Sequence, residues 1–267
     1  MTKIITVIIP TYNRKLNFNL ISKFYKFKKK IELIIVDDGS NQLIESFNSK
    51  KIKKYLEFKY LHYHKNRGQS FACNSGIKIT NTKYVWFFDD DDNISIKTLD
   101  KILFSLKKNF DGLLLPMKQV YKNKLINLVY PSIRSHTFDD LRDNGQLVST
   151  SCAIFKTKII KKIKGWDIKL FGGTDTDLFL RFSKYGNFSF IDTNPVIINI
   201  SKPNRLTNKV FRQQLAKIYF LKKHWKILTI KRILYYLITG LFFYPLFYGI
   251  RNKMKYLSKK RSIFHIM

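Results

Sequence analysis

The chain has 267 residues, 45% of them hydrophobic and 25% charged, and a formal net charge of +32. This composition excludes a chain that is disordered by composition and leaves room for one large α/β domain, with or without an appendage. Cys73 and Cys152 form no CxxC pair or Cys/His cluster, which argues against a zinc site or a disulfide framework. The first apolar run, Ile4–Ile9, is too short for a signal peptide, so we expect a cytoplasmic protein.

Four short apolar runs in the first hundred residues predict buried strands, separated by helix-compatible stretches at about 15–30, 41–54 and 70–80. This alternation is typical of a parallel sheet covered on both faces. The predicted strands are Thr6–Pro10, Leu33–Asp37, Lys59–His64 and Tyr84–Asp89. In such sheets ligands bind outside the carboxyl ends of the strands, so the residues that follow each strand are the candidate site.

The first strand is followed by Pro10, Thr11, Tyr12, Asn13 and Arg14. The GxGxxG pattern of a dinucleotide-binding Rossmann fold is absent here. Tyr12 could stack on a nucleobase, and Thr11 and Asn13 could form hydrogen bonds with one. Alternatively, this segment is a helix N-terminus capped by Asn13.

The second strand is followed by Asp37, Asp38, Gly39 and Ser40. A carboxylate at a strand end can accept a hydrogen bond from a uracil imide or a ribose hydroxyl, and Gly39 permits a tight turn. The alternative is an ordinary Asp-Gly turn. Because a second strand end carries polar side chains, we favour the functional interpretation.

The fourth strand is followed by the run Asp89–Asp92. Adjacent carboxylates disfavour each other's ionised form unless a divalent cation lies between them. Mg²⁺ or Mn²⁺ typically takes one or two protein carboxylates and completes its shell with substrate phosphates and water. A calcium loop of the EF-hand type fails, because Ile94 and Asp100 stand where glycine and glutamate are needed. We therefore predict a site for a divalent ion with a nucleotide diphosphate, against the alternative of a solvated acidic loop.

Residues from about 110 to 155 predict mixed strands and loops, and Gly172–Gly186 contains a predicted helix that begins near Thr174 or Asp175. Asp175 and Asp177 are candidates for a general base, because a positioned carboxylate can take the proton of an attacking hydroxyl. The competing interpretation is a helix N-terminus, where acidic residues are common. Arg181 is a possible partner for one of these acids.

Taken in order, these motifs resemble family 2 glycosyltransferases of the GT-A fold over roughly residues 4 to 200. The motifs are Pro10–Arg14, Val36–Ser40, Asn66–Gly76, Phe88–Asp92 and Gly173–Asp177. The resemblance implies an α/β fold with a mixed, mainly parallel sheet flanked by helices. It also implies an inverting, metal-dependent enzyme of the hexosyltransferase type that uses a nucleotide-sugar donor, usually a UDP-sugar, with Mn²⁺ or Mg²⁺ as cofactor.

The resemblance also assigns roles to residues. It places Pro10–Arg14 and Asp38 on the nucleotide, with Thr11 and Tyr12 against the base and Asp38 bonded to it. Arg67 reaches the nucleotide, and Asp90 lies near the ribose. Asp91 is the first choice as metal ligand, followed by Asp89, and Asp175 is the catalytic base. Asp92 receives no role.

Two positions depart from the family pattern. Thr174 stands where the family often has glutamate, and Cys73 stands where it often has the arginine of an Ala-Arg-Asn segment. The aspartate that follows this glutamate in the family is kept here as Asp175. Asp175 therefore remains the expected base, although the neighbouring carboxylate is missing. The second departure weakens any phosphate contact at Cys73.

The last quarter of the chain is basic and predicted to be helical. From Ser201 to Met267 there are 16 lysines and arginines and no acidic residue. An uncharged run, Ile233–Ile250, lies between basic residues and contains Pro245. We expect this run to lie in the membrane interface rather than to span the bilayer, with docking on the protein's own domain as a further possibility.

We therefore predict a glycosyltransferase domain at 1–205 and a membrane-associating tail at 206–267, with the protein peripheral on the cytoplasmic face of the inner membrane. The expected acceptor is a saccharide, free or lipid-linked, in cell-surface polysaccharide or lipooligosaccharide synthesis. Two alternatives stay open: a basic nucleic-acid-binding protein, and a glycosyltransferase-like protein that Thr174 has made inactive. We do not expect nucleic acid as a partner, because no nucleic-acid motif is present.

Overall fold

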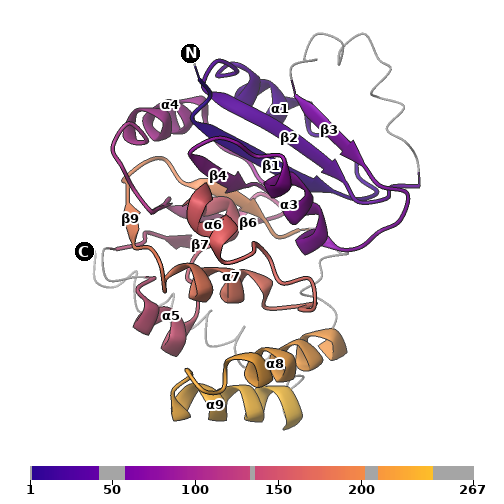
Figure 1. Cartoon of the computed structure of the whole chain (residues 1–267), viewed down its shortest axis with the longest axis vertical. Coiled ribbons are helices and arrows are strands. Elements are labelled where there is room, and N and C mark those ends of the chain that lie inside the picture. The colour runs from indigo at the N-terminus through magenta and orange to yellow at the C-terminus, as the bar shows by residue number, and fades with distance from the viewer. Residues whose placement is uncertain (1, 42–57, 133–135, 202–209, 243–267) are drawn as a thin grey trace. The chain divides into compact units, whose positions relative to one another are not determined.

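The computed structural model describes residues 2–41, 58–132, 136–201 and 210–242 (Figure 1). The chain forms two compact units, which are described separately. Unit 1 comprises Met1–Lys169 and Thr174–Lys202, and unit 2 comprises Leu170–Gly173 and Pro203–Met267. The division into a glycosyltransferase domain at 1–205 and a membrane-associating tail at 206–267 stays a prediction. The helix expected at about 41–54 lies mostly outside the described residues.

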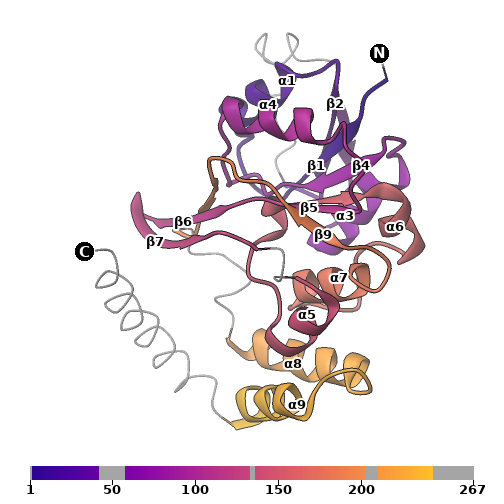
Figure 2. The ribbon, with the colours of Figure 1, turned by 90° about the vertical axis from the view of Figure 1, so that its left-hand side faces the viewer.

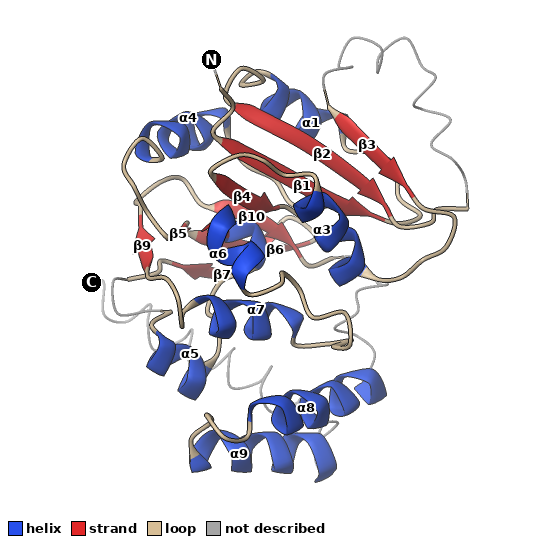
Figure 3. Ribbon diagram, in the orientation of Figure 1, coloured by secondary structure: helices blue, strands red, loops and turns tan. Residues whose placement is uncertain are grey.

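Unit 1 is built on a seven-stranded sheet in the order β3-β2-β1-β4-β8-β5-β9 (Figure 3). The pairs among β1 to β4 are parallel, and β8 runs antiparallel to both of its neighbours. The strands are β1 Ile5–Thr11, β2 Ile31–Asp37, β3 Lys59–His62, β4 Tyr84–Phe87, β5 Gly112–Leu114, β8 Ala153–Lys156 and β9 Phe188–Phe190. The predicted mixed, mainly parallel sheet is confirmed.

Helices cover both faces of this sheet (Figure 2). On one face, Phe24 of α1 packs edge-on against Trp86 and Phe88, with ring centroids 5.8 Å and 5.4 Å away. On the other face, a Cβ at Gly76 of α3 would come within 2.7 Å of Ile8, so only glycine lets α3 approach β1 this closely. The helices described in unit 1 are α1 Phe18–Tyr25, α3 Gln69–Lys78, α4 Ile96–Ser105, α5 Phe138–Asn144, α6 Thr157–Lys162 and α7 Thr174–Phe182.

A second, three-stranded sheet has the order β10-β6-β7. Its strands are β6 Met117–Tyr121, β7 Lys124–Val129 and β10 Val196–Asn199. An isolated bridge between Asn93 and Ile197 joins this sheet to the loop that follows β4. The mixed strands and loops predicted for 110–155 are therefore present, but α5 and the short 3₁₀ turn η2 Thr150–Cys152 also lie in this stretch.

The described residues of unit 2 form two helices and a short π-helix, as the helical pattern of the tail predicted. They are α8 Val210–His224, α9 Ile230–Leu237 and η4 Ile238–Phe242. The helices pack through aromatic rings, with the centroid of Phe220 on α8 5.1 Å from that of Tyr236 on α9. Within the described ranges, no helix is long and apolar enough to cross a membrane. Residues 243–250 of the predicted interfacial run lie outside those ranges.

Candidate active site

The carboxyl ends of β1 and β2 lie side by side. The register pairs Thr11 with Asp37, and the amide of Asp38 donates to the carbonyl of Thr11 over 2.9 Å. Because β4 runs parallel to β1, Asp89–Asp92 emerge at the same edge of the sheet. The motifs that follow three predicted strands therefore meet at one edge.

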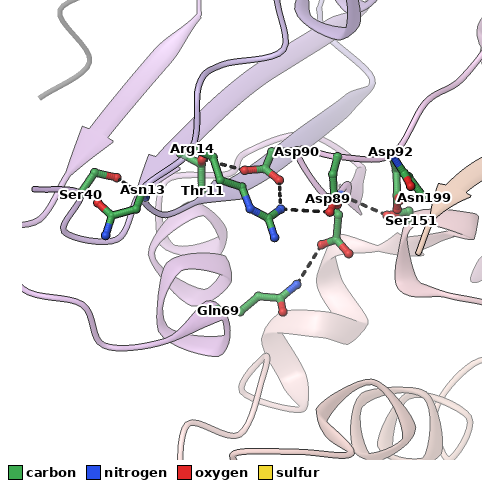
Figure 4. A network of polar contacts seen from close by, with 11 residues as sticks. Thr11, Asn13, Arg14, Ser40, Gln69, Asp89, Asp90, Asp92, Ser151 and Asn199 are labelled. Atoms are coloured by element: carbon green, nitrogen blue, oxygen red, sulfur yellow. Dashed lines mark hydrogen bonds and ion pairs between the residues drawn. The ribbon is translucent and has the colours of Figure 1, made fainter. Parts of the chain in front are cut away.

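The loop after β1 is bonded to the loop after β2 through Asn13. Its backbone amide donates to Oγ of Ser40 over 2.8 Å, and its side-chain oxygen accepts from the amide of Asn41 over 2.9 Å (Figure 4). Asn13 is thus a bridge between loops, and the cap of α1 is Asn17, whose side chain accepts from the amide of Leu20. Tyr12 beside it is 43% exposed, so its ring is free to meet a ligand.

The pair Asp37 and Asp38 holds the backbone of this edge. Asp37 is fully buried and accepts from the hydroxyl of Tyr60 at 2.8 Å and from both the amide and Oγ of Ser40. The carboxylate of Asp38 accepts from the amides of Arg67 and Gly68, over 3.0 Å and 2.6 Å. Burial raises the pKa of Asp38 and these amide bonds oppose the rise. Asp38 therefore fixes the start of α3, and its predicted bond to the base stays a prediction.

Two further features complete this corner. Gly39 has φ +84°, and a Cβ there would lie 2.5 Å from the backbone of Lys65 and Asn66, so no other residue fits without a backbone shift. The guanidinium of Arg67 lies 3.8 Å from the centroid of the Phe71 ring. Arg67 is exposed, which leaves its edge available to a nucleotide.

The four consecutive aspartates form a turn, with the amide of Asp92 bonded to the carbonyl of Asp89. One oxygen of Asp90 accepts from the hydroxyl of Thr11 at 2.8 Å and the other pairs with Arg14. Arg14 also reaches Asp91 at 3.1 Å, so its guanidinium bridges two carboxylates. Burial raises the pKa of Asp90, while Arg14 and Thr11 oppose the rise.

The outer two aspartates point to other partners (Figure 4). Asp89 accepts from the side-chain amide of Gln69 over 2.9 Å, and its own amide donates to Oγ of Ser151 over 3.0 Å. Asp92 is buried and accepts from the amide of Asn199 on β10 over 3.3 Å. Asp92, for which the sequence indicated no role, thus ties the turn to the second sheet.

The two acids of α7 have different environments. Asp177 is fully buried and accepts from Nε and NH2 of Arg181, at 2.8 Å and 2.6 Å. Arg181 also donates to the carbonyl of Ile163 over 2.8 Å, which anchors α7 beside the end of α6. Arg181 does pair with one of the acids, and this pairing removes Asp177 from the candidates for the general base. Asp175, two residues earlier in the same helix, is partly exposed.

Asp175 contributes to the same electrostatic environment as two of the strand-end carboxylates. Burial raises the pKa of Cys73 on α3 well above its usual value, and Asp89, Asp175 and Asp38 raise it further, in that order of effect. The role of Asp175 as the general base stays a prediction.

The site fits a divalent ion only if a ligand supplies most of its coordination. Among the residues that the structure describes, no three His, Cys, Asp or Glu side chains converge to hold a metal. Asp89 and Asp91 are the two residues of the turn that are not classed as buried, although the side chain of Asp91 is only 7% exposed. Two carboxylates suit Mg²⁺ or Mn²⁺ bound together with a diphosphate, and they do not suit an all-protein cage.

Sequence reasoning missed several residues that support this site. Gln69 and Ser151 hold Asp89, as described above. Asn74 exchanges two hydrogen bonds of 2.8 Å with the backbone of Trp166, which fixes the turn after α6. Gln69 and Asn74 lie within the segment Asn66–Gly76 and could have been suspected, whereas nothing near Ser151 in the sequence signals its partner.

The sequence of this chain is similar to those of known glycosyltransferases. The model of the family described as "Glycosyl transferase family 2" matches residues 6–164. An uncharacterized glycosyltransferase of Methanocaldococcus jannaschii is 24% identical over 238 residues, which is 84% of this chain and 80% of that protein. The poly(ribitol-phosphate) β-N-acetylglucosaminyltransferase TarP of Staphylococcus aureus is 36% identical over 119 residues, or 42% of this chain and 36% of TarP. The chain thus spans about a third of the length of TarP.

Two solved structures share the fold. The crystal structure of residues 1–349 of S. aureus TarS in complex with UDP-GlcNAc has a TM-score of 0.64 and 19% identity, over 89% of this chain and 73% of that one. The mannosyltransferase PcManGT of Pyrobaculum calidifontis, solved with GDP-Man and Mn²⁺, has a TM-score of 0.58 and 16% identity, over 88% of this chain and 69% of that one. At these identities the likeness shows the fold alone.

Proposed function

This chain belongs to glycosyl transferase family 2, and we propose that it is an inverting glycosyltransferase that moves a sugar from a nucleotide-sugar donor, a UDP-sugar, to a saccharide hydroxyl. The observation that carries the proposal is the meeting of three strand-end motifs at one edge of the sheet, where the hydroxyl of Thr11 donates to Asp90 and the amide of Asp38 donates to the carbonyl of Thr11. In the proposal this edge receives the donor, and Asp175 of α7 serves as the base for the acceptor.

In the proposed reaction Asp175 takes the proton of the acceptor hydroxyl as its oxygen attacks the anomeric carbon. The new bond joins that carbon to the acceptor oxygen. The bond between the anomeric carbon and the diphosphate oxygen breaks, and the nucleoside diphosphate leaves with the electron pair. Attack from the face opposite the leaving group inverts the configuration, through a transition state of oxocarbenium character as in glycoside hydrolysis.

We assign donor binding to side chains at this edge of the sheet. Tyr12 and Arg67 are exposed, and in the proposal Tyr12 stacks on the base and Arg67 reaches the nucleotide. Asp91 and Asp89 would hold Mn²⁺ or Mg²⁺, which would neutralise charge on the departing diphosphate. Support for a metal comes from PcManGT, which was solved with GDP-Man and Mn²⁺, and from the two-carboxylate donor set.

We further propose that the acceptor belongs to a cell-surface polysaccharide or lipooligosaccharide, handled at the cytoplasmic face of the inner membrane. The name of TarP, which specifies transfer to poly(ribitol-phosphate), supports a polymeric acceptor. The basic tail at 206–267 supports attachment to a membrane surface. Family membership favours this function over nucleic-acid binding.

A panel of nucleotide sugars, scored by thermal shift with and without Mn²⁺, tests the donor. A ligand at about 100 times its dissociation constant stabilises the folded state by about 2.7 kcal/mol, so the true donor should stand out. Transfer that proceeds undiminished in chelator without added divalent ion would remove the metal from the proposal. Donor hydrolysis in the presence of Mn²⁺ distinguishes an active enzyme from one that Thr174 has made inactive.

A further inference from the structure

Unit 2 presents large apolar side chains to solvent on one face of each helix. We call this set the α8–α9 surface. It comprises Leu215, Ile218, Tyr219, Trp225, Ile230, Leu234, Leu237 and Ile238, all of which are exposed. Single exposed apolar residues are normal, but a group of this size on two adjacent helices indicates an interaction surface.

Exposed aliphatic residues of α9 and the first residue of η4 fall on one stripe. Ile230, Leu234, Leu237 and Ile238 follow the spacing i, i+4, i+7 and i+8, which covers an arc of about 100°. Ile230 is 76% exposed and Leu234 is 50% exposed. The packing face of the helix is a different one, because Tyr236 is buried against Phe220. The exposed stripe is therefore not the face that holds the two helices together.

On α8 the same division holds. Ala216 and Phe220 are buried, while Leu215, Ile218 and Tyr219 are exposed on the other side. The segment that follows α9 also lies against α8, because a Cβ at Gly240 in η4 would come 3.6 Å from Lys217 on α8. The exposed stripes thus belong to one compact piece of the chain.

The charge around the α8–α9 surface is of one sign. Lys222, Lys223, Lys226 and Lys231 are exposed within or beside the stripes. No acidic residue occurs from Ser201 to Met267. A second copy of this surface would bring lysines against lysines, which disfavours a self-associating interface. A polyanion such as nucleic acid would use the lysines but leave the apolar side chains in water.

We propose that the α8–α9 surface docks on an anionic lipid bilayer, with its apolar side chains at the boundary of headgroups and acyl chains and its lysines on the headgroup phosphates. This inference deepens the membrane attachment proposed above by naming the surface that makes it, and it does not depend on the proposed glycosyl transfer. It extends the contact predicted for the run Ile233–Ile250 toward the N-terminus, because five of the eight residues of the surface precede Ile233.

The test is co-sedimentation of the full chain with phosphatidylcholine vesicles that contain or lack phosphatidylglycerol. Wild type should bind the anionic vesicles and release them as salt is raised. Leu234→Glu should weaken this binding by about tenfold or more. Each of Lys222→Gln and Lys223→Gln should weaken it by about fivefold. Phe104→Glu is the matched control: Phe104 on α4 is 67% exposed but lies outside the surface, and its replacement should change nothing.

Several results would overturn the proposal. Vesicle binding by Leu234→Glu equal to that of wild type would overturn it. Loss of binding in the lysine variants alone would also overturn it, because it would indicate a contact with polyanions. Loss of a dimer in Leu234→Glu with unchanged vesicle binding would indicate a face between copies of the chain. Thermal unfolding checks that Leu234→Glu folds, and Leu234→Gln replaces it if it does not. Turnover on a soluble acceptor should be unchanged in every variant, so failure here is separable from failure of the proposed reaction.

Discussion

The strand-edge site and the α8–α9 surface use charge in opposite ways. At the site, carboxylates are largely buried and each has a specific partner, such as Arg14 for Asp90 or Gln69 for Asp89. On the α8–α9 surface, cations are exposed among apolar side chains, and residues 201–267 contain no Asp or Glu. Fixed partners select a ligand by geometry, whereas an exposed basic and apolar face selects a partner by its charge and hydrophobicity. Substitutions should therefore act position by position at the site and in graded, salt-dependent steps on the surface.

The largest effect should come from the proposed base. Asp175→Asn should lower kcat by about a hundredfold to ten-thousandfold, because a positioned general base contributes about that much. Calorimetric titration should find donor binding nearly unchanged. Asp192→Asn, at an exposed aspartate of unit 1, is the control and should retain activity. Wild-type turnover in Asp175→Asn would contradict the assignment.

Two positions further along α7 the same change should act on stability instead. Asp177→Asn leaves the guanidinium of Arg181 without its buried carboxylate, and breaking a buried pair typically costs about 3–5 kcal/mol. Urea denaturation should show the loss as a lower midpoint. If Asp177→Asn unfolded like wild type but lost turnover, the roles of the two acids would be reversed.

A buried histidine of unit 1, His136, should make the stability of the fold depend on pH. Burial lowers the pKa of His136 to about 4, although Asp140 opposes the shift. Between pH 6.5, near the usual pKa of histidine, and pH 4 the unfolded chain binds a proton that the folded chain does not, so stability falls as pH falls through this window. The loss should reach about 3 kcal/mol.

The comparison with His136→Asn isolates this contribution. Asparagine suits the backbone at this position, where φ is +64°, and it does not titrate. Urea unfolding at a series of pH values should show a shallower decline between pH 6.5 and pH 4 in His136→Asn than in wild type. Parallel declines in the two proteins would rule out His136 as the source.

The smallest effect is expected at Arg14, whose positive charge should lower the affinity of the site for a metal ion. Arg14→Met removes the guanidinium that bridges Asp90 and Asp91. A positive charge about 3–4 Å from a carboxylate near a protein surface repels a metal ion by about 1 kcal/mol or more, so Mn²⁺ affinity without nucleotide should rise about fivefold. Electron paramagnetic resonance of free Mn²⁺ measures this directly, and Lys15→Met is the control at the neighbouring exposed residue. Weaker Mn²⁺ binding in Arg14→Met would show that Arg14 supports the metal rather than competing with it.

Much of the fold and part of the site were predictable from the sequence. The apolar runs were sufficient to predict β1, β2 and β4, because fully buried strands need nearly continuous apolar residues. The strand β3 was also predicted, although none of its residues is buried. Helices α4 and α6 were not anticipated, and α5 lies inside a stretch predicted as strands and loops. Short helices carry little periodicity of their own, and their stability comes from packing against the sheet.

The sequence by itself determined that Pro10–Arg14, Asp37–Ser40 and Asp89–Asp92 would meet, because parallel strands place their carboxyl ends at one edge. Only the tertiary structure decided what each carboxylate does. Four consecutive side chains in a turn point in different directions, and their partners, Arg14, Gln69 and Asn199, lie 20 to 107 residues away. The same holds for Asp175 and for the α8–α9 surface, since contact across the fold and exposure to solvent depend on how distant segments pack.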